Sequence, residues 1–92
     1  MIVQDIYNII DRFAPFATAS SWDNAGMLVG DPYSDVTGVL LALDATPQVI
    51  AQAVEKGFNL IVTHHPIIFS PIKSIVAGTN VYNLLTNQLS II

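Results

Sequence analysis

Two short apolar runs with an amphipathic segment between them constrain the fold of this chain more than any other sequence feature. The runs occupy residues 39–43 and 60–62. Between them, Thr46 followed by Pro47 favours a helix start, and Gly57 favours a helix end. A strand, a helix and a second strand this close together predict a βαβ unit with parallel strands and a right-handed crossover. Because both runs are apolar throughout, we expect a mostly parallel sheet covered by helices on both faces.

The rest of the chain extends this α/β prediction. Residues 2–14 place apolar side chains at helical spacing, and Pro15 ends that pattern. In the helix after Thr46, the side chains expected to face the sheet are Val49, Ile50, Ala53 and Val54. The further expected elements are an ordered loop over residues 15–25, a short strand at 27–29, a loop or short helical turns at 67–78, a helix that starts at Thr79 or Asn80, and a strand that begins at Ser90. We therefore predict a single α/β domain over residues 1–92.

Charged residues are scarce in this chain of 92 residues. Lys and Arg number 3 and Asp and Glu number 7, which makes 11% charged residues against roughly 25% in an average soluble domain. Hydrophobic residues reach 52%, so the composition excludes a disordered chain. So few cations cannot form the basic patch of a nucleic-acid binder, and no apolar stretch approaches the roughly 18 residues of a membrane span. We therefore expect this chain to bind neither nucleic acid nor a membrane. We also expect its apolar surface to be buried against another subunit or a further part of the same chain.

The two ends of the chain give expectations about location and completeness. The N-terminal residues lack the basic and apolar regions of a signal peptide, and the chain contains no cysteine. These features predict a cytoplasmic protein without disulfides or thiolate metal sites. Residues 90–92 are typical of an apolar strand that continues, so we expect the chain to be truncated.

The chain's 2 histidines, His64 and His65, are adjacent and follow directly from the second apolar run. Ligands of α/β proteins bind at the carboxyl ends of strands, which is where this pair lies. Pro66 favours an extended backbone at His65, and successive side chains of an extended chain point to opposite sides. The pair is therefore better suited to two neighbouring ions than to chelating one, and neutral imidazole suits zinc, iron, copper and nickel. On the pattern alone, a metal or catalytic role and a structural role are equally supported.

Several other polar residues have a functional and a structural interpretation. Asp44 ends the first strand, and parallel pairing brings its carboxylate to the sheet edge that holds the histidines. There it would orient an imidazole or bind a metal, although hydrogen bonding at the start of the next helix is the commoner role. Trp22 is expected to be a buried anchor, and Asp23 and Asn24 are expected to make local turn hydrogen bonds. The sequence contains neither a serine-nucleophile elbow nor a Gly-rich phosphate loop.

Two ordered motifs are together more specific than the histidine pair. The first is SWDNAGMLVG at residues 21–30. The second runs from LALDAT at 41–46 through AVEKG at 53–57 to LIVTHHPIIF at 60–69. In order and spacing these segments resemble the Nif-three-like family, also known as GTP cyclohydrolase I type 2 homologues or dinuclear metal-centre proteins. The resemblance covers essentially all 92 residues.

This resemblance implies an α/β fold with a dinuclear metal site. The family's double histidine supplies ligands to both ions, which implies that His64 and His65 are metal ligands here. Its further ligands are an Asp shortly after the next strand and a His and a Glu near the C-terminus. The resemblance therefore implies that residues 1–92 are the N-terminal part of a larger fold, whose complete site holds two divalent ions (zinc, iron or manganese). It also implies homo-oligomers, which are ring-shaped hexamers in the family.

Two functions from different classes follow as hypotheses. The first is a divalent-metal-binding protein that acts as a metal-dependent hydrolase on an unidentified small molecule, as the family's cyclohydrolase name implies. The alternative is a non-catalytic, oligomeric interaction or regulatory module, which the scarcity of charge favours. The sequence leaves the metal, the substrate and the reaction open.

Overall fold

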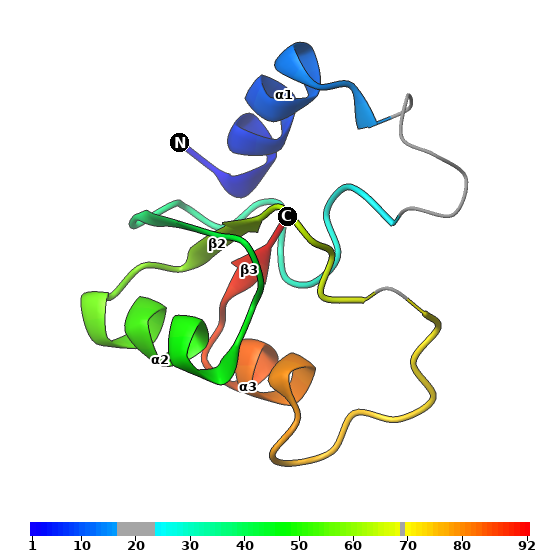
Figure 1. Ribbon diagram of the computed structural model, residues 1–92. Coiled ribbons are helices and arrows are strands. Elements are labelled where there is room, and N and C mark those ends of the chain that lie inside the picture. Colours follow the sequence, from blue (N-terminus) through cyan, green and yellow to red (C-terminus); the bar gives the residue numbers. More distant parts are fainter. Residues whose placement is uncertain (17–23, 69) are drawn as a thin grey trace.

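A three-stranded parallel sheet forms the centre of the computed structural model, with the strand order β1-β2-β3 (Figure 1). The structure describes residues 1–16, 24–68 and 70–92. Its elements are α1 (Val3–Phe13), β1 (Val39–Ala42), α2 (Pro47–Lys56), β2 (Leu60–Thr63), α3 (Asn80–Thr86) and β3 (Ser90–Ile91). β1 pairs in parallel with β2, with Val39 opposite Leu60, and β2 pairs in parallel with β3. The predicted α/β fold with a βαβ core is confirmed.

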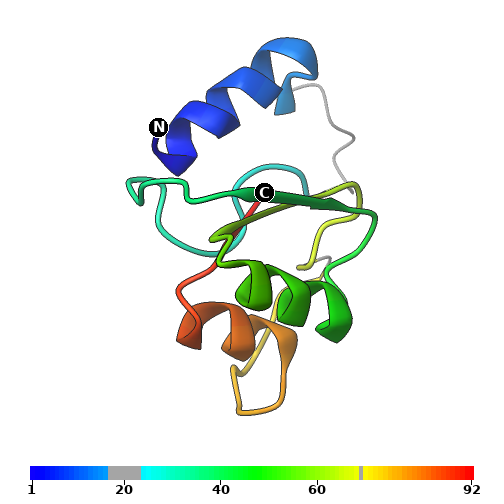
Figure 2. The same ribbon diagram turned by 90° about the vertical axis from the view of Figure 1, so that its left-hand side faces the viewer.

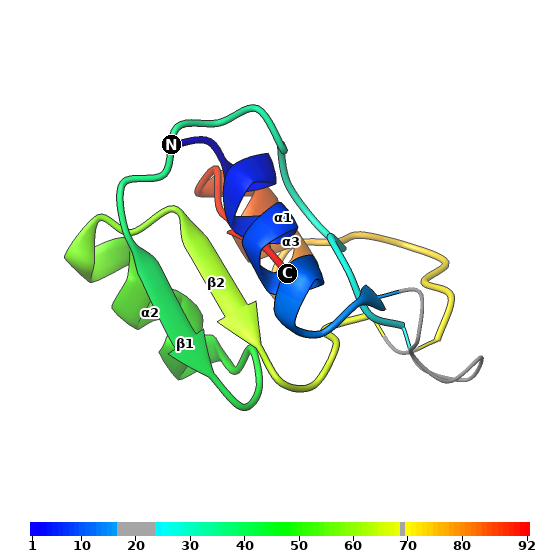
Figure 3. The same ribbon diagram turned by 90° about the horizontal axis from the view of Figure 1, so that it is seen from above.

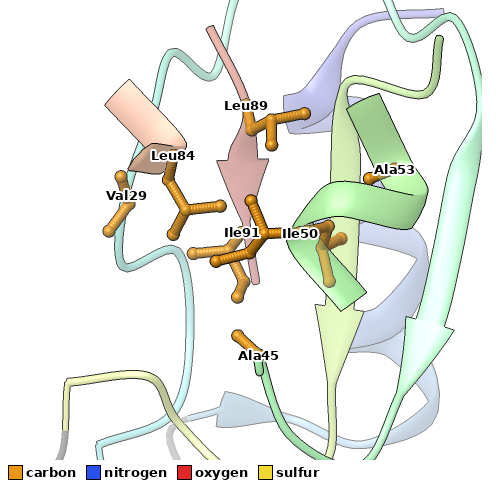
Figure 4. Close-up of a cluster of buried hydrophobic side chains, with 8 residues drawn as sticks. Val29, Ala45, Ile50, Ala53, Leu84, Leu89 and Ile91 are labelled. Carbon is orange, nitrogen blue, oxygen red and sulfur yellow. The ribbon is translucent and has the colours of Figure 1, made fainter. Parts of the chain in front are cut away.

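Helices lie on both faces of the sheet. α1 lies on one face, and α2 and α3 lie on the other (Figure 2). The α1 side buries Val3, Leu60 and Ile92. A larger cluster on the opposite side draws side chains from α2, α3 and β3 (Figure 4), and its buried members are Val29, Ala45, Ile50, Ala53, Ile61, Leu84, Leu89 and Ile91. None of the helices within the described residues is long and apolar enough to cross a membrane.

Local sequence signals set both ends of α2. The Thr46 hydroxyl accepts a hydrogen bond from the Val49 amide at 3.2 Å, and Pro47 occupies the first helical position. At the other end Gly57 has a φ of +71°, the left-handed conformation that commonly ends a helix. These ends agree with the predicted ones because capping depends on residues close together in the sequence.

The predicted inward face of α2 is confirmed in part. Ile50 and Ala53 are buried, and Val49 packs against the same cluster while partly exposed. Val54 is 45% exposed, so its predicted contact with the sheet is wrong. Adjacent residues of a helix lie about 100° apart around its axis, which turns Val54 away from the contact that Ala53 makes. α2 therefore buries a narrower stripe than the spacing predicts.

Residues 27–29 are predicted to form a strand, and this prediction is wrong. The segment makes one isolated antiparallel bridge, between Val29 and Ile91. The Ile91 amide donates to the Val29 carbonyl at 2.9 Å, and the Leu28 amide donates to the Ile91 carbonyl at 3.1 Å. Gly30, with a φ of +112°, turns the chain immediately afterwards, so the bridge does not extend into a ladder.

The C-terminal elements follow the sequence prediction closely. Thr79 caps α3, because its hydroxyl accepts a hydrogen bond from the Tyr82 amide at 3.3 Å. The described part of residues 67–78 is a loop. β3 adds the expected third strand, with Ser90 opposite Leu60. The chain therefore continues the parallel sheet beyond the βαβ unit.

Part of the surface near β1 remains open to solvent. Seen from the α1 side, α1 lies over the sheet while β1 lies clear of it (Figure 3). Leu41 and Leu43 are 73% and 65% exposed, and Phe13 at the end of α1 is 87% exposed. Exposed apolar side chains, which the composition predicts, are therefore present, and two of them lie in and just after β1.

Candidate metal centre

The carboxyl ends of β1 and β2 hold the histidine pair at one edge of the sheet. The strand register places Ala42 opposite Thr63, and the pairing continues beyond both strands. The His64 amide donates to the Ala42 carbonyl at 3.1 Å, and the His65 amide donates to the Leu43 carbonyl at 2.9 Å. The backbone of the candidate ligands is therefore fixed against the end of β1.

The two imidazole rings lie close together and have different neighbours. Their centroids are 5.0 Å apart and their planes are inclined by 54°. The His65 ring contacts Asp44, with 2.9 Å between Nδ1 and Oδ1, whereas His64 borders a cavity. Both histidines are exposed. This divergence agrees with the alternation expected of an extended backbone.

Asp44 contacts His65 rather than the start of α2. The hydroxyl of Thr46 accepts the hydrogen bond from the Val49 amide there, so α2 has its cap without Asp44. The side chains of Asp44 and His65 are each 57% exposed, which leaves their contact open to solvent. The structure therefore favours the interpretation of Asp44 as a partner of an imidazole.

A cavity of about 120 Å³ lies beside His64. Phe16, Asn24 and Gly26 line it together with residues of β2, and Phe16 stacks on Tyr7 with 4.6 Å between ring centroids. Among the described residues that line the cavity, His64 has the one titratable side chain. The cavity therefore joins the motif at residues 21–30 to the double histidine.

Asn24 ties the first motif to the segment that follows the histidines. Its Nδ2 donates a hydrogen bond of 2.6 Å to the Ile68 carbonyl, 44 residues away in the sequence. Beside the local turn hydrogen bond predicted for Asn24, its amide nitrogen therefore makes a tertiary contact that the sequence does not predict. The predicted roles of Trp22 and Asp23 lie outside the described residues.

The donors at this edge fit part of a metal centre. Imidazole nitrogen and carboxylate oxygen are suitable donors for zinc, iron and manganese. The ring spacing of 5.0 Å is compatible with neighbouring ions about 3.5–4 Å apart. Within the part of the chain that the structure describes, no group of three or more His, Cys, Asp or Glu side chains is placed to hold one ion. Protein metal sites commonly use three or four protein ligands, so a complete centre would need additional donors.

Comparison with known proteins assigns the chain to a family. The family model described as Duf34/NIF3 (NGG1p interacting factor 3) matches residues 1–92. The chain belongs to this family. The Staphylococcus aureus relative named GTP cyclohydrolase 1 type 2 homolog is 47% identical over 89 residues, which cover 97% of this chain and 24% of the relative. The Nif-three-like resemblance seen in the sequence is therefore confirmed.

Solved structures related to Duf34/NIF3 share the fold. Staphylococcus aureus protein SA1388 has a TM-score of 0.95 and 42% identity, covering 100% of this chain and 27% of that one. A Bacillus cereus protein related to NIF3 has a TM-score of 0.92 and 29% identity, covering 99% of this chain and 26% of that one. The chain thus spans about a quarter of the length of these relatives, which agrees with a part of a larger fold.

The cavity beside His64 is the main site feature that sequence reasoning missed. Phe16 follows a predicted helix and carries no chemical signal of its own. Only the packing of α1 against the sheet places it near His64. The motif at residues 21–30 is the one sequence signal for this cavity, but its spacing does not predict which strand end the motif packs against.

Proposed function

We propose that this chain carries one part of a divalent-metal centre of the NIF3 type. His64 and His65 each supply an imidazole to one of two neighbouring ions, and the remaining ligands come from outside residues 1–92. The observation that carries the proposal is the pair of exposed rings 5.0 Å apart at the carboxyl end of β2. Zinc, iron and manganese all suit these donors together with carboxylates.

Hydrolysis of a small molecule is the reaction that this arrangement supports best. A divalent ion at the histidine pair would supply Lewis acidity and a water activated for attack. The cavity beside His64 offers room for a small substrate group, and its described lining contains no Lys, Arg, Asp or Glu. An uncharged part of the substrate would fit there. The name of the Staphylococcus aureus relative, GTP cyclohydrolase 1 type 2 homolog, also favours hydrolytic chemistry.

Zinc uptake by histidine variants tests this proposal. The 92-residue chain and its variants are dialysed against zinc, and the bound metal is measured by elemental analysis. We expect His64→Ala and His65→Ala each to lower zinc uptake, and the double variant to abolish it. Gln52→Ala, an exposed change on α2, serves as the control and should match the unchanged chain. Undiminished uptake by the double variant, with its fold intact by circular dichroism, would contradict the proposal.

A second candidate function is a non-catalytic module that assembles into homo-oligomers. It is favoured by the exposure of Leu41 and Leu43, in and just after β1, and of Phe13 at the end of α1. We expect sedimentation to show a defined oligomer that Leu41→Asp weakens. Tyr33→Asp, at a side chain that is 78% exposed elsewhere, is the matched control and should leave the oligomer intact. A monomer at high protein concentration would count against assembly through residues 1–92.

A further inference from the structure

We propose that Asp44 is a positioning residue that holds the His65 ring with its proton on Nδ1 and thereby presents Nε2 to a metal ion. The inference rests on the proposed function, since it specifies which nitrogen of His65 binds. It starts from the distance of 2.9 Å between Asp44 Oδ1 and His65 Nδ1. A carboxylate only accepts hydrogen bonds, so the ring nitrogen facing it donates. In a neutral imidazole the other nitrogen then carries the free lone pair.

The backbone on the His65 side is fixed by three features. The His65 amide donates to the Leu43 carbonyl at 2.9 Å, and the Thr63 hydroxyl donates to the His65 carbonyl at 2.7 Å. Pro66 then restricts the backbone conformation of His65 further. The ring therefore projects from a restrained backbone, unlike the side chain of a residue in an unanchored loop.

The backbone around Asp44 is fixed as well. Before it, the Ala42 and Leu43 carbonyls accept hydrogen bonds from the histidine amides. After it, Ala45 is buried in the larger core cluster, and the Asn80 Nδ2 donates to the Ala45 carbonyl at 3.1 Å. Asp44 and His65 also have short side chains, so little rotamer freedom is lost when they meet. This restraint distinguishes the contact from an ordinary surface ion pair between long, mobile side chains.

The short distance between Asp44 Oδ1 and His65 Nδ1 indicates a hydrogen bond between the two side chains. It does not fit two side chains that bind the same metal ion through these atoms. Two tetrahedral zinc ligands at about 2.0–2.1 Å from the metal would lie about 3.3 Å from one another. The separation of Oδ1 and Nδ1 is 2.9 Å, which is a usual hydrogen-bond length. Carboxylate partners of this kind fix the tautomer and raise the basicity of a metal-binding imidazole. Asp44 therefore acts on the metal through His65.

His64 provides an internal comparison. Within the described residues, the His64 ring makes a tilted contact with the His65 ring and borders the cavity, but it donates no hydrogen bond to a carboxylate. Removing the Asp44 carboxylate should therefore change the tautomer of His65 and leave that of His64 unchanged. A general loss of stability would not single out one of two adjacent rings.

The tautomers are measured by nitrogen-15 NMR of the imidazole rings in the metal-free, 92-residue chain, in alkaline buffer where imidazole is neutral. We expect His65 to carry its proton on Nδ1 in the unchanged chain and to become a mixture of tautomers in Asp44→Ala. Asp44→Asn offers the ring either an amide oxygen or an amide N–H, so it accommodates both tautomers and should also give a mixture. Glu55→Ala, which removes an exposed carboxylate on α2, should change neither ring.

Zinc titration of the same samples gives the second readout. Loss of an outer carboxylate partner typically weakens metal binding by about 10–100-fold, and we expect Asp44→Ala to fall in that range. A His65 ring with its proton on Nε2 in the unchanged chain, or a His65 tautomer unaffected by Asp44→Ala, would overturn the positioning role. If Asp44→Ala fails to fold, Asp44→Asn and the unchanged chain still decide the tautomer. An Asp44-dependent tautomer in a chain that binds no zinc would support the positioning contact and count against the proposed function instead.

Discussion

Gly30→Ala is expected to destabilise the fold by about 2–5 kcal/mol, since it combines a steric clash with backbone strain. Gly30 has a φ of +112°, which side-chain-bearing residues rarely adopt. A Cβ at this position would lie 2.6 Å from both the Cα and the Cβ of Ser90 and would also meet the Ser90 hydroxyl. Ser90 is buried at the start of β3, so the clash would displace the third strand.

Gly78→Ala separates the two contributions in this experiment. Gly78 has a φ of +94°, but a Cβ there would meet no atom within 4 Å. This control therefore carries the backbone strain without the clash. Urea unfolding monitored by circular dichroism gives both free energies of unfolding. Equal losses in the two variants would show that the close approach of Gly30 to Ser90 does not support β3.

Leu84→Ala is expected to lower the free energy of unfolding by about 2–5 kcal/mol, as in other large-to-small changes in a packed core. Leu84 is fully buried on α3 and belongs to the cluster between the sheet and the helices α2 and α3 (Figure 4). Its removal leaves a cavity next to Ile91 of β3, because both residues belong to this cluster.

Leu85→Ala is the matched control for that change. Leu85 is the next residue of the same helix and is 46% exposed, so the substitution alters helix propensity equally but removes far less buried surface. We expect its cost to stay below about 1 kcal/mol. Thermal or urea unfolding measures both variants. Similar losses at the two positions would mean that α3 does not pack on the sheet through Leu84.

The parts of the fold that the sequence predicts depend on local signals. Thr46 and Gly57 set the ends of α2 through contacts within the helix itself. The parallel pairing of β1 and β2 follows because a connection through a helix returns the chain in the same direction. The strand predicted at residues 27–29 fails because a ladder needs a long-range partner, and Gly30 turns the chain after one bridge.

The candidate site shows the same division between local and tertiary information. His64 and His65 are visible in the sequence as an adjacent pair at a strand end. The partner of Asp44 cannot be read from the sequence, because the position of Asp44 is compatible both with capping of α2 and with contact to an imidazole. The register that sets Ala42 opposite Thr63 decides between them. Asn24 is a similar case, since its amide reaches the Ile68 carbonyl only when the two motifs pack together.

The central claim is that His64 and His65 are ligands of a divalent-metal centre. Its most direct test is a zinc titration of the nitrogen-15-labelled, 92-residue chain, followed through the ring resonances of both histidines. We predict that zinc shifts the resonances of both rings and that the coordinated nitrogen of His65 is Nε2. The backbone amide of Tyr33, an exposed residue that lines neither the histidine pair nor its cavity, should keep its resonance. Rings that fail to respond to zinc in large excess, in a chain that remains folded, would contradict the claim.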